Sequence, residues 1–174
     1  TRDNGIPLRD EEICLPEVLR DAGYRTAAIG KMHFTTQFMP KVNEEDDWPA
    51  DNYGFEVIHT TCDCKTGEYL EWLKEKSPRD YEVVKMQGER KAKEDRASAA
   101  DKDLSGPPQV YPSEINPQYH QSAWIADRMI DLIQESDGER PFFALCSFVD
   151  PHHPFDPPAP YSTMYNPGTL APPV

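Results

Sequence analysis

The segment Gly23–Phe34 constrains the fold of this 174-residue chain more than any other stretch. Its apolar run Ala27–Ile29 has the length and composition of a buried strand. Gly30 ends the run, and Lys31 and His33 follow with one residue between them. Ligands of open α/β sheets bind at the carboxyl ends of strands. The sequence therefore predicts a fixed cation and an imidazole at such an end, a pair suited to a tetrahedral oxyanion such as sulfate or phosphate.

A second apolar segment, Pro141–Val149, has the composition of a central strand buried on both faces. It runs into the proline-rich stretch Asp150–Pro158. Prolines fix φ and prevent further strand pairing, so this loop is predicted to present His152 and His153 on a stiff backbone at another strand end. His152 stands in a Pro-His-x-Pro pattern and is the stronger candidate. For His153, a second substrate contact and a structural role both remain open.

Helical periodicity precedes each of these strands. Apolar spacing predicts a short helix over Leu15–Ala22, whose apolar face is expected to pack against Ala28 and Ile29. A longer helix is predicted over Tyr119–Gln134, with Asn116 as its cap. The order helix, strand, loop thus occurs twice. It predicts an α/β fold with a mostly parallel sheet and flanking helices.

The intervening segments carry weaker signals. Tyr53–His59 alternates like an edge strand, and Glu68–Lys76 is a modest amphipathic helix that Pro78 is expected to stop. Residues 35–49 are predicted to be a long loop, and residues 85–108 are so polar that they are expected to form a flexible insertion or a solvated helix. His120 could approach the predicted anion site at the strand ends. A role as a helix cap or a surface residue is the favoured interpretation.

Charge and cysteine content limit the partners. The net charge of −13, from 18 basic and 31 acidic residues, argues against nucleic acid. No apolar run is long enough to span a membrane. Cys14 and Cys146 are predicted to be buried thiols. Cys62 and Cys64 form a Cys-x-Cys pair without a second pair downstream, so no metal site is assigned to them.

The motifs resemble those of the sulfatases, of the arylsulfatase-like kind. Gly23–Phe34 resembles the sulfatase signature in which a Gly-Tyr-x-Thr strand runs into Gly-Lys-x-His, and residues 151–154 resemble the family's Pro-His-x-Pro loop. Tyr53–Glu56 is similar to a Tyr-Gly-Phe-Asp segment of these enzymes. The resemblance implies an alkaline-phosphatase-like fold. It also implies that residues 1–174 are an internal part of a single sulfatase catalytic domain, with 85–108 as an insertion.

The same resemblance implies a mechanism. The lysine matching Lys31 binds sulfate oxygens, and the histidine matching His33 contacts a formylglycine hydrate and takes its proton when sulfate is expelled. The histidine matching His152 protonates the leaving alcohol. Formylglycine arises from a Cys/Ser-x-Pro-x-Arg motif, and a divalent cation, usually Ca²⁺, holds it and the sulfate. This sequence contains no such motif, and the family's metal ligands fall outside it. We therefore expect the segment alone to be inactive and not to bind Ca²⁺ at the catalytic position.

Two other functions remain open. A phosphoester or phosphonate hydrolase of the same superfamily can keep the Pro-His-x-Pro loop but often replaces the Lys-x-His pair, so Lys31 and His33 favour sulfate. A non-catalytic acidic interaction module would use its histidines structurally. The expected partner is a small-molecule or carbohydrate sulfate ester. The sequence does not identify the alcohol, the oligomeric state or the compartment.

Overall fold

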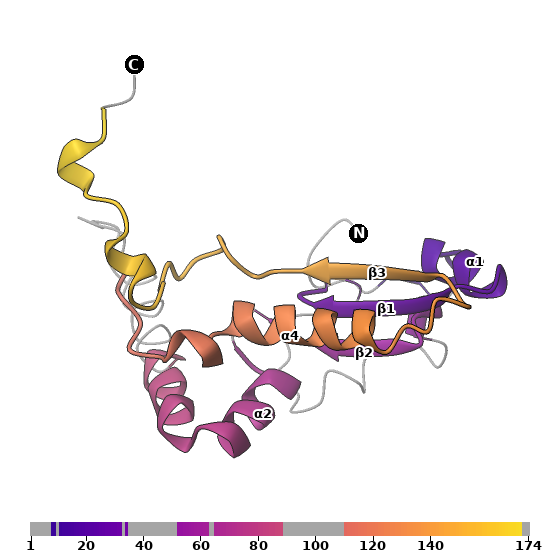
Figure 1. The fold of residues 1–174 in the computed structure, drawn as a ribbon, viewed down its shortest axis with the longest axis horizontal. Coiled ribbons are helices and arrows are strands. Elements are labelled where there is room, and N and C mark those ends of the chain that lie inside the picture. Colours follow the sequence, from indigo (N-terminus) through magenta and orange to yellow (C-terminus); the bar gives the residue numbers. More distant parts are fainter. Residues whose placement is uncertain are drawn as a thin grey trace. The chain divides into compact units, whose positions relative to one another are not determined.

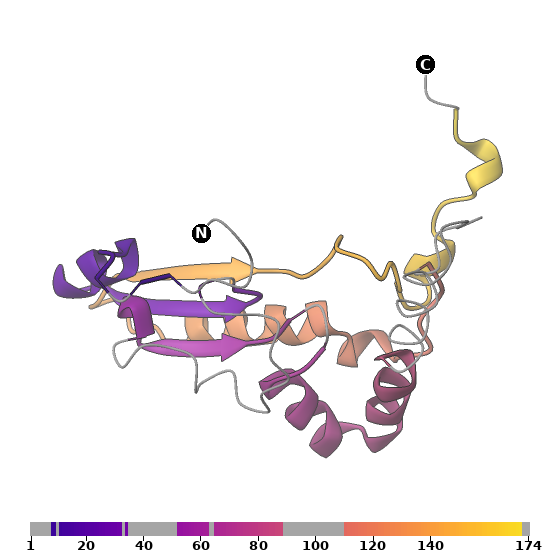
Figure 2. The ribbon, with the colours of Figure 1, turned by 180° about the vertical axis from the view of Figure 1, so that it is seen from behind.

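The computed structural model describes residues 8–9, 11–32, 34, 52–62, 65–88 and 110–171. The chain divides into two compact units (Figures 1 and 2). The first unit comprises Thr1–Trp72 and Gln121–Val149, and the second comprises Leu73–His120 and Asp150–Val174. The predicted loop 35–49 lies outside the described residues, as does the predicted insertion 85–108 beyond residue 88.

The first unit is built on a three-stranded parallel sheet with the strand order β2-β1-β3. β1 (Arg25–Gly30) is central, β2 (Val57–Thr60) and β3 (Phe142–Ser147) flank it, and Ala27 pairs with both Val57 and Ala144. The predicted α/β class with a parallel sheet is therefore confirmed. Because the three strands run the same way, their carboxyl ends meet at one edge of the sheet.

The core lies around β1 rather than β3. Ala27, Ala28 and Ile29 of β1 are fully buried, as the apolar run predicts. β3 is an edge strand in the described sheet, and Phe142 and Leu145 keep 37% and 38% of their surface exposed. The prediction that β3 is buried on both faces is thus not met by these residues.

Helices lie on both faces of the sheet (Figures 1 and 2). α4 (Gln121–Gln134) covers one face and buries Trp124 and Ile125 completely. On the other face, α1 (Leu15–Asp21) packs on the 3₁₀ turn η2 (Asn52–Gly54), whose Tyr53 joins Ala28 and Phe55 in a hydrophobic cluster. Helix α4 begins two residues later than predicted, because Asn116 caps the preceding 3₁₀ turn η3 (Pro117–Tyr119) instead.

The predicted packing of α1 is wrong. Leu15 and Val18 are 60% and 52% exposed, and Pro16 is the buried residue of this helix. The helix approaches η2 so closely that a Cβ on Gly54 would lie 2.2 Å from the backbone nitrogen of Glu17. Contact with this turn and with β1 holds α1 in place.

The strand predicted over Tyr53–His59 forms only in its second half, as β2. Asn52, Tyr53 and Gly54 all have positive φ, at 53°, 53° and 83°. Three such residues in succession turn the chain tightly and cannot belong to an extended strand. Alternation of apolar residues therefore predicted the strand's existence but not its start.

Helices and loops make up the second unit. Helix α2 (Glu68–Lys76) has the predicted bounds and passes from the first unit into the second. Pro78 does not simply end it, because residues 78–88 form another helix. Parallel bridges join Val110 to Phe155 and Ser113 to Pro158, and the 3₁₀ turns η4 (Tyr161–Thr163) and η5 (Pro167–Thr169) follow. None of the helices among the described residues has the length and apolarity needed to cross a membrane.

Candidate functional site

Lys31 is fixed at the carboxyl end of β1 by its own backbone. Its N–H donates a hydrogen bond of 2.9 Å to the carbonyl oxygen of Ser147, the last residue of β3. Gly30 makes this approach possible, because it has a φ of +97° and a Cβ in its place would lie 1.9 Å from that same oxygen. The Gly-Lys step of the sequence thus joins two strand ends and holds the half-buried lysine at the edge where a ligand is expected.

The loop after β3 carries His152 and His153, both in the second unit. Nδ1 of His152 lies 2.6 Å from the carbonyl oxygen of His153, and the two rings stack with their centroids 4.2 Å apart. A carbonyl oxygen only accepts, so Nδ1 of His152 carries a proton. An imidazole held in this way presents its other ring nitrogen, Nε2, for chemistry with a ligand.

His120 is buried and not at the surface, contrary to one of the predicted roles. Its backbone N–H donates to the carbonyl oxygen of Pro117, so it ends the turn η3. Its Nδ1 lies 3.9 Å from Oδ2 of Asp150, within the second unit. Asp150 stands two residues before His152, so this pair connects the end of η3 with the histidine loop.

The carboxyl end of β2 carries polar contacts that sequence analysis missed. The N–H of Thr61 donates to the carbonyl oxygen of Gly30, and the buried amide of Gln121 donates to the hydroxyl of Thr61. Nδ1 of His59 lies 2.9 Å from both carboxylate oxygens of Glu68. The sequence did contain a sign of this pair. His59 ends a predicted strand, and Glu68 lies in the first turn of the next predicted helix.

Cys14 and Cys146, which were predicted to be buried thiols, are less buried than expected. Cys14, Cys62 and Cys146 are half-buried, and no disulfide forms among the described residues. Burial raises the pKa of the Cys146 thiol above its ordinary value. Cys64 lies outside the described residues, so the Cys-x-Cys pair is not tested.

The structure therefore places some of the predicted site residues and not others. Lys31 lies in the first unit, His152 and His153 lie in the second, and His33 lies outside the described residues. Convergence of these side chains on one anion remains a prediction. No group of three or more His, Cys, Asp or Glu side chains is placed to hold a metal ion in the described part of the chain. The described residues thus do not fit the calcium site that the resemblance implies.

The motifs and the parallel sheet agree with a comparison against protein families. A family model described as sulfatase matches residues 1–170. The chain belongs to the sulfatase family. This sulfatase-family chain is 26% identical over 176 residues to an arylsulfatase of Clostridium perfringens (strain 13 / Type A), with 99% of the chain and 33% of that protein covered.

Among solved structures, the sulfatase-family chain is similar to a phosphonate monoester hydrolase of Agrobacterium radiobacter. The TM-score is 0.55 at 23% sequence identity, with 95% of this chain and 31% of that chain covered. At this identity the likeness shows the fold alone, which is alkaline-phosphatase-like as expected. The chain spans about a third of the length of both proteins.

Proposed function

We propose that the protein containing this chain is a sulfuric ester hydrolase, and that Lys31, His33 and His152 belong to its sulfate-binding site. The observation that carries the proposal is the Lys31–Ser147 hydrogen bond in a chain of the sulfatase family. It holds the lysine at the carboxyl edge of the sheet, beside the strand that leads into the histidine loop. Ser147 pairs with Gly30, and four residues separate Ser147 from His152.

The proposed roles follow from the chemistry of ester cleavage. As the bond between sulfur and the ester oxygen breaks, its electron pair moves to that oxygen. A proton from Nε2 of His152 neutralises the leaving alcohol, which is worth a factor of about 10²–10⁴ in rate. The ammonium of Lys31 stabilises the remaining sulfate oxygens. His33 supplies a second imidazole at the site, and His153 contacts the substrate beside His152.

The nucleophile and the metal are proposed to come from other parts of the protein. The family implies a formylglycine and Ca²⁺, but this sequence has no Cys/Ser-x-Pro-x-Arg motif, and the described residues offer no ligand set for a metal. We propose that residues 1–174 form part of one catalytic domain, with 85–108 as a polar, flexible insertion. On this view the segment alone neither turns over sulfate esters nor binds Ca²⁺ at the catalytic position.

The test uses the full-length protein with an aryl sulfate, an aryl phosphate and an aryl phosphonate as paired substrates. We expect the highest kcat/KM for the sulfate, and a fall of at least about 100-fold in Lys31→Ala and His152→Ala. Lys85→Ala is the matched control, because Lys85 is an exposed cation paired with Glu82. Unchanged turnover in both site variants would favour a non-catalytic module.

A phosphonate or phosphoester hydrolase is the second candidate, since the solved structure that resembles this chain cleaves phosphonate monoesters according to its name. It predicts a higher kcat/KM for the phosphonate or phosphate substrate than for the sulfate. The Lys-x-His pair at positions 31 and 33 favours the sulfatase. The substrate ratio of the unmodified protein separates the two.

A further inference from the structure

The first residue of α4, Gln121, is a buried polar side chain. Only 3% of its surface is exposed, although glutamine belongs to the residue types that mostly lie at protein surfaces. Its Nε2 donates one hydrogen bond to the hydroxyl oxygen of Thr61 and another, of 2.8 Å, to the carbonyl oxygen of Cys62. A side-chain amide has two N–H donors, so both are used. Because a buried amide is costly unless its hydrogen bonds are made, these two contacts determine where the side chain lies.

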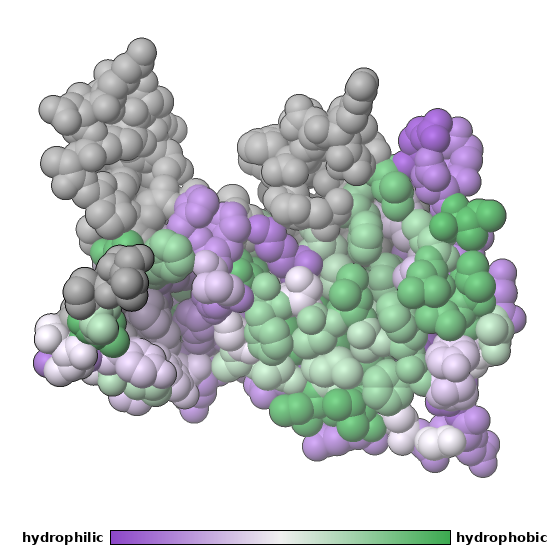
Figure 3. Space-filling model, turned by 90° about the horizontal axis from the view of Figure 1, so that it is seen from above, coloured by the Kyte–Doolittle hydropathy of each residue, from purple (hydrophilic) through white to green (hydrophobic). Residues whose placement is uncertain are grey.

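The course of α4 places this amide against the sheet. The helix runs antiparallel to the strands and begins near their carboxyl ends (Figure 1). Ile125 lies one turn after Gln121 on the same side of the helix, it is fully buried, and a Cβ at Gly30 would lie 3.3 Å from its Cδ1. Hydrophobic residues dominate even the surface of the first unit in the view onto the β3 side (Figure 3). In so apolar a unit, Gln121 is held by specific hydrogen bonds and not by a polar environment.

Thr61, which accepts from Gln121, lies one residue beyond the end of β2 and is 2% exposed. Its hydroxyl donates to the carbonyl oxygen of Thr66 at 3.3 Å, and its N–H donates to the carbonyl oxygen of Gly30 at 3.2 Å. The hydroxyl has a single proton and gives it to Thr66, so the contact with Gln121 needs the amide as its donor. Gln121 therefore fixes the residue that reaches from β2 to the end of β1.

The peptide group between Gly30 and Lys31 is held from both sides. Its carbonyl oxygen accepts from the N–H of Thr61, and its N–H donates to the carbonyl oxygen of Ser147 at 2.9 Å. Because a peptide group is planar, these two hydrogen bonds fix its orientation and hence the direction in which the Lys31 side chain leaves the backbone. On the β3 side the partner is the last residue of a strand. On the β2 side the partner is Thr61, which the buried amide of Gln121 holds in place.

We propose that Gln121 is a positioning residue of the sulfate site, which acts on Lys31 through Thr61 and the Gly30–Lys31 peptide. This inference rests on the proposed function of Lys31. When the amide of Gln121 is removed, the peptide loses its fixed partner on the β2 side, and the ammonium of Lys31 spends less time at the sulfate oxygens. Misplacement by about 1 Å can reduce a rate by about 100-fold, so we expect about 10-fold for an effect transmitted through a flexible lysine side chain.

A double-mutant cycle in the full-length protein tests the proposal. Gln121→Met keeps the length of the side chain but removes both donors, and we expect it to lower kcat/KM by about 10-fold. In a Lys31→Ala background the same substitution should lower kcat/KM by less than about 2-fold, because the group that Gln121 positions is already absent. Equal factors in the two backgrounds would overturn the proposal, since a purely structural defect lowers activity with or without Lys31. The control is Gln134→Met, at the exposed last residue of α4, which should change neither value.

Thr61→Val supplies a milder second variant, because valine has nearly the shape of threonine but lacks the hydroxyl. The backbone N–H at position 61 can still donate to Gly30, but Gln121 no longer holds the side chain. We expect the same pattern as for Gln121→Met, with a loss of kcat/KM in the unmodified background and almost none beside Lys31→Ala. Full activity of Thr61→Val would contradict the proposed connection.

The choice of substrate and a second measurement separate this proposal from the proposed function. The cycle is run on whichever aryl sulfate, phosphate or phosphonate the unmodified protein cleaves fastest, so it does not depend on the ester. Independently of activity, Gln121→Met should speed hydrogen exchange at the amides of Thr61 and Lys31 by at least about 10-fold and leave that of Ala27 unchanged. Unchanged exchange at Thr61 would overturn the proposal. A protein that cleaves none of the three esters would overturn the proposed function, and with it any role of Gln121 toward sulfate, even if the exchange data showed the connection to Thr61.

Discussion

Arg140 and Glu56 are 84 positions apart in the sequence, yet the guanidinium Nη2 lies 2.9 Å from the carboxylate Oε2. Arg140 also donates to the carbonyl oxygens of Gly23 and Tyr24, and Glu56 accepts from the N–H of Thr26. The pair thus joins the chain just before β2 and β3 to the start of β1. These contacts lie at the amino end of the sheet, opposite the edge that holds Lys31.

This relationship predicts an acid-sensitive contribution to stability. Desolvation raises the pKa of Glu56, but the Thr26 N–H and the Arg140 guanidinium outweigh it, so the pKa falls below its ordinary value of 4.5. A depressed carboxyl pKa stabilises the fold fully above that ordinary value, and the contribution is lost as pH falls through the folded pKa. Because both side chains are partly exposed, we expect Glu56→Gln to lower the free energy of unfolding by only about 1 kcal/mol at pH 7.

Urea unfolding at pH 7 and at pH 3 checks this. The difference between the unmodified protein and Glu56→Gln should shrink at the lower pH, whereas Glu139→Gln, in an exposed turn, should behave like the unmodified protein at both. A difference that stays constant with pH would show that the charge of Glu56 is not what stabilises the contact.

A second prediction concerns Gly30 and has a matched control in Gly23. Both residues have positive φ, at +97° and +93°, but a Cβ would lie 1.9 Å from the Ser147 oxygen at Gly30 and would meet nothing within 4 Å at Gly23. Gly23→Ala therefore incurs only backbone strain, of about 1 kcal/mol. Gly30→Ala adds a clash with backbone and should cost more than about 3 kcal/mol. Thermal unfolding measures both, and equal costs would argue against the close approach of β1 to β3.

Local sequence patterns predicted the elements well where one physical signal dominated. The apolar run before Lys31 predicted β1. Amphipathic spacing predicted α2 with its observed bounds, and α4 with a start two residues from the observed one. Pro78 was misjudged because proline both ends a helix and suits the first turn of a new one. The Ser77-x-x-Asp80 spacing was the neglected sign that a helix starts there.

The candidate site shows where sequence reasoning stops. Lys31 and His152 could be chosen because each follows a predicted strand, and strand ends are where ligands bind. The contacts of Gln121 with Thr61 and of Arg140 with Glu56 could not, because they join residues 60 and 84 positions apart. Such pairs depend on how the elements pack, which no local periodicity encodes.

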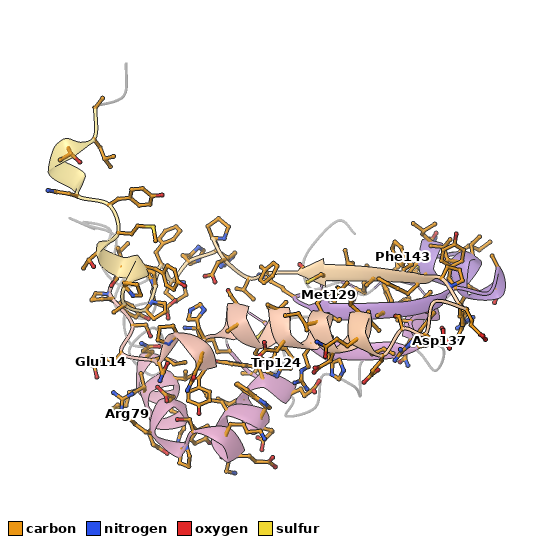
Figure 4. All side chains as sticks on the ribbon, in the orientation of Figure 1. Arg79, Glu114, Trp124, Met129, Asp137 and Phe143 are labelled. Carbon is orange, nitrogen blue, oxygen red and sulfur yellow. The ribbon has the colours of Figure 1, made fainter. Side chains whose placement is uncertain are left out.

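A third prediction tests the anchor of the second unit. The carboxylate of Asp80 is 3% exposed, and it accepts hydrogen bonds from the hydroxyl of Ser77 and, at 2.9 Å, from the N–H of Asn116. Arg79, which lies beside it, also reaches the carbonyl oxygen of Glu114 (Figure 4). Asp80→Ala leaves two donors without this acceptor, and we expect a loss of about 2–3 kcal/mol.

Chemical denaturation of Asp80→Ala and Glu82→Ala measures the effect. Glu82 is an exposed residue of the same helix, so its removal should change the free energy of unfolding by less than about 0.5 kcal/mol. If the two variants were equally stable, the buried carboxylate would not be what ties residues 78–88 to the turn before α4.

The last prediction separates the proposed roles of Lys31 and His152 in the full-length enzyme. A proton donor matters most when the leaving alcohol is a weak acid, whereas a cation on the sulfate oxygens acts whatever the alcohol is. His152→Ala should therefore reduce kcat much more for an alkyl sulfate than for a nitrophenyl sulfate, and Lys31→Ala should reduce both by similar factors. His153→Ala, which removes the neighbouring stacked ring but keeps the backbone carbonyl bonded to His152, should have a smaller effect on kcat. A plot of log kcat against the pKa of the alcohol makes the distinction. A slope that His152→Ala leaves unchanged would remove this histidine from the proton transfer.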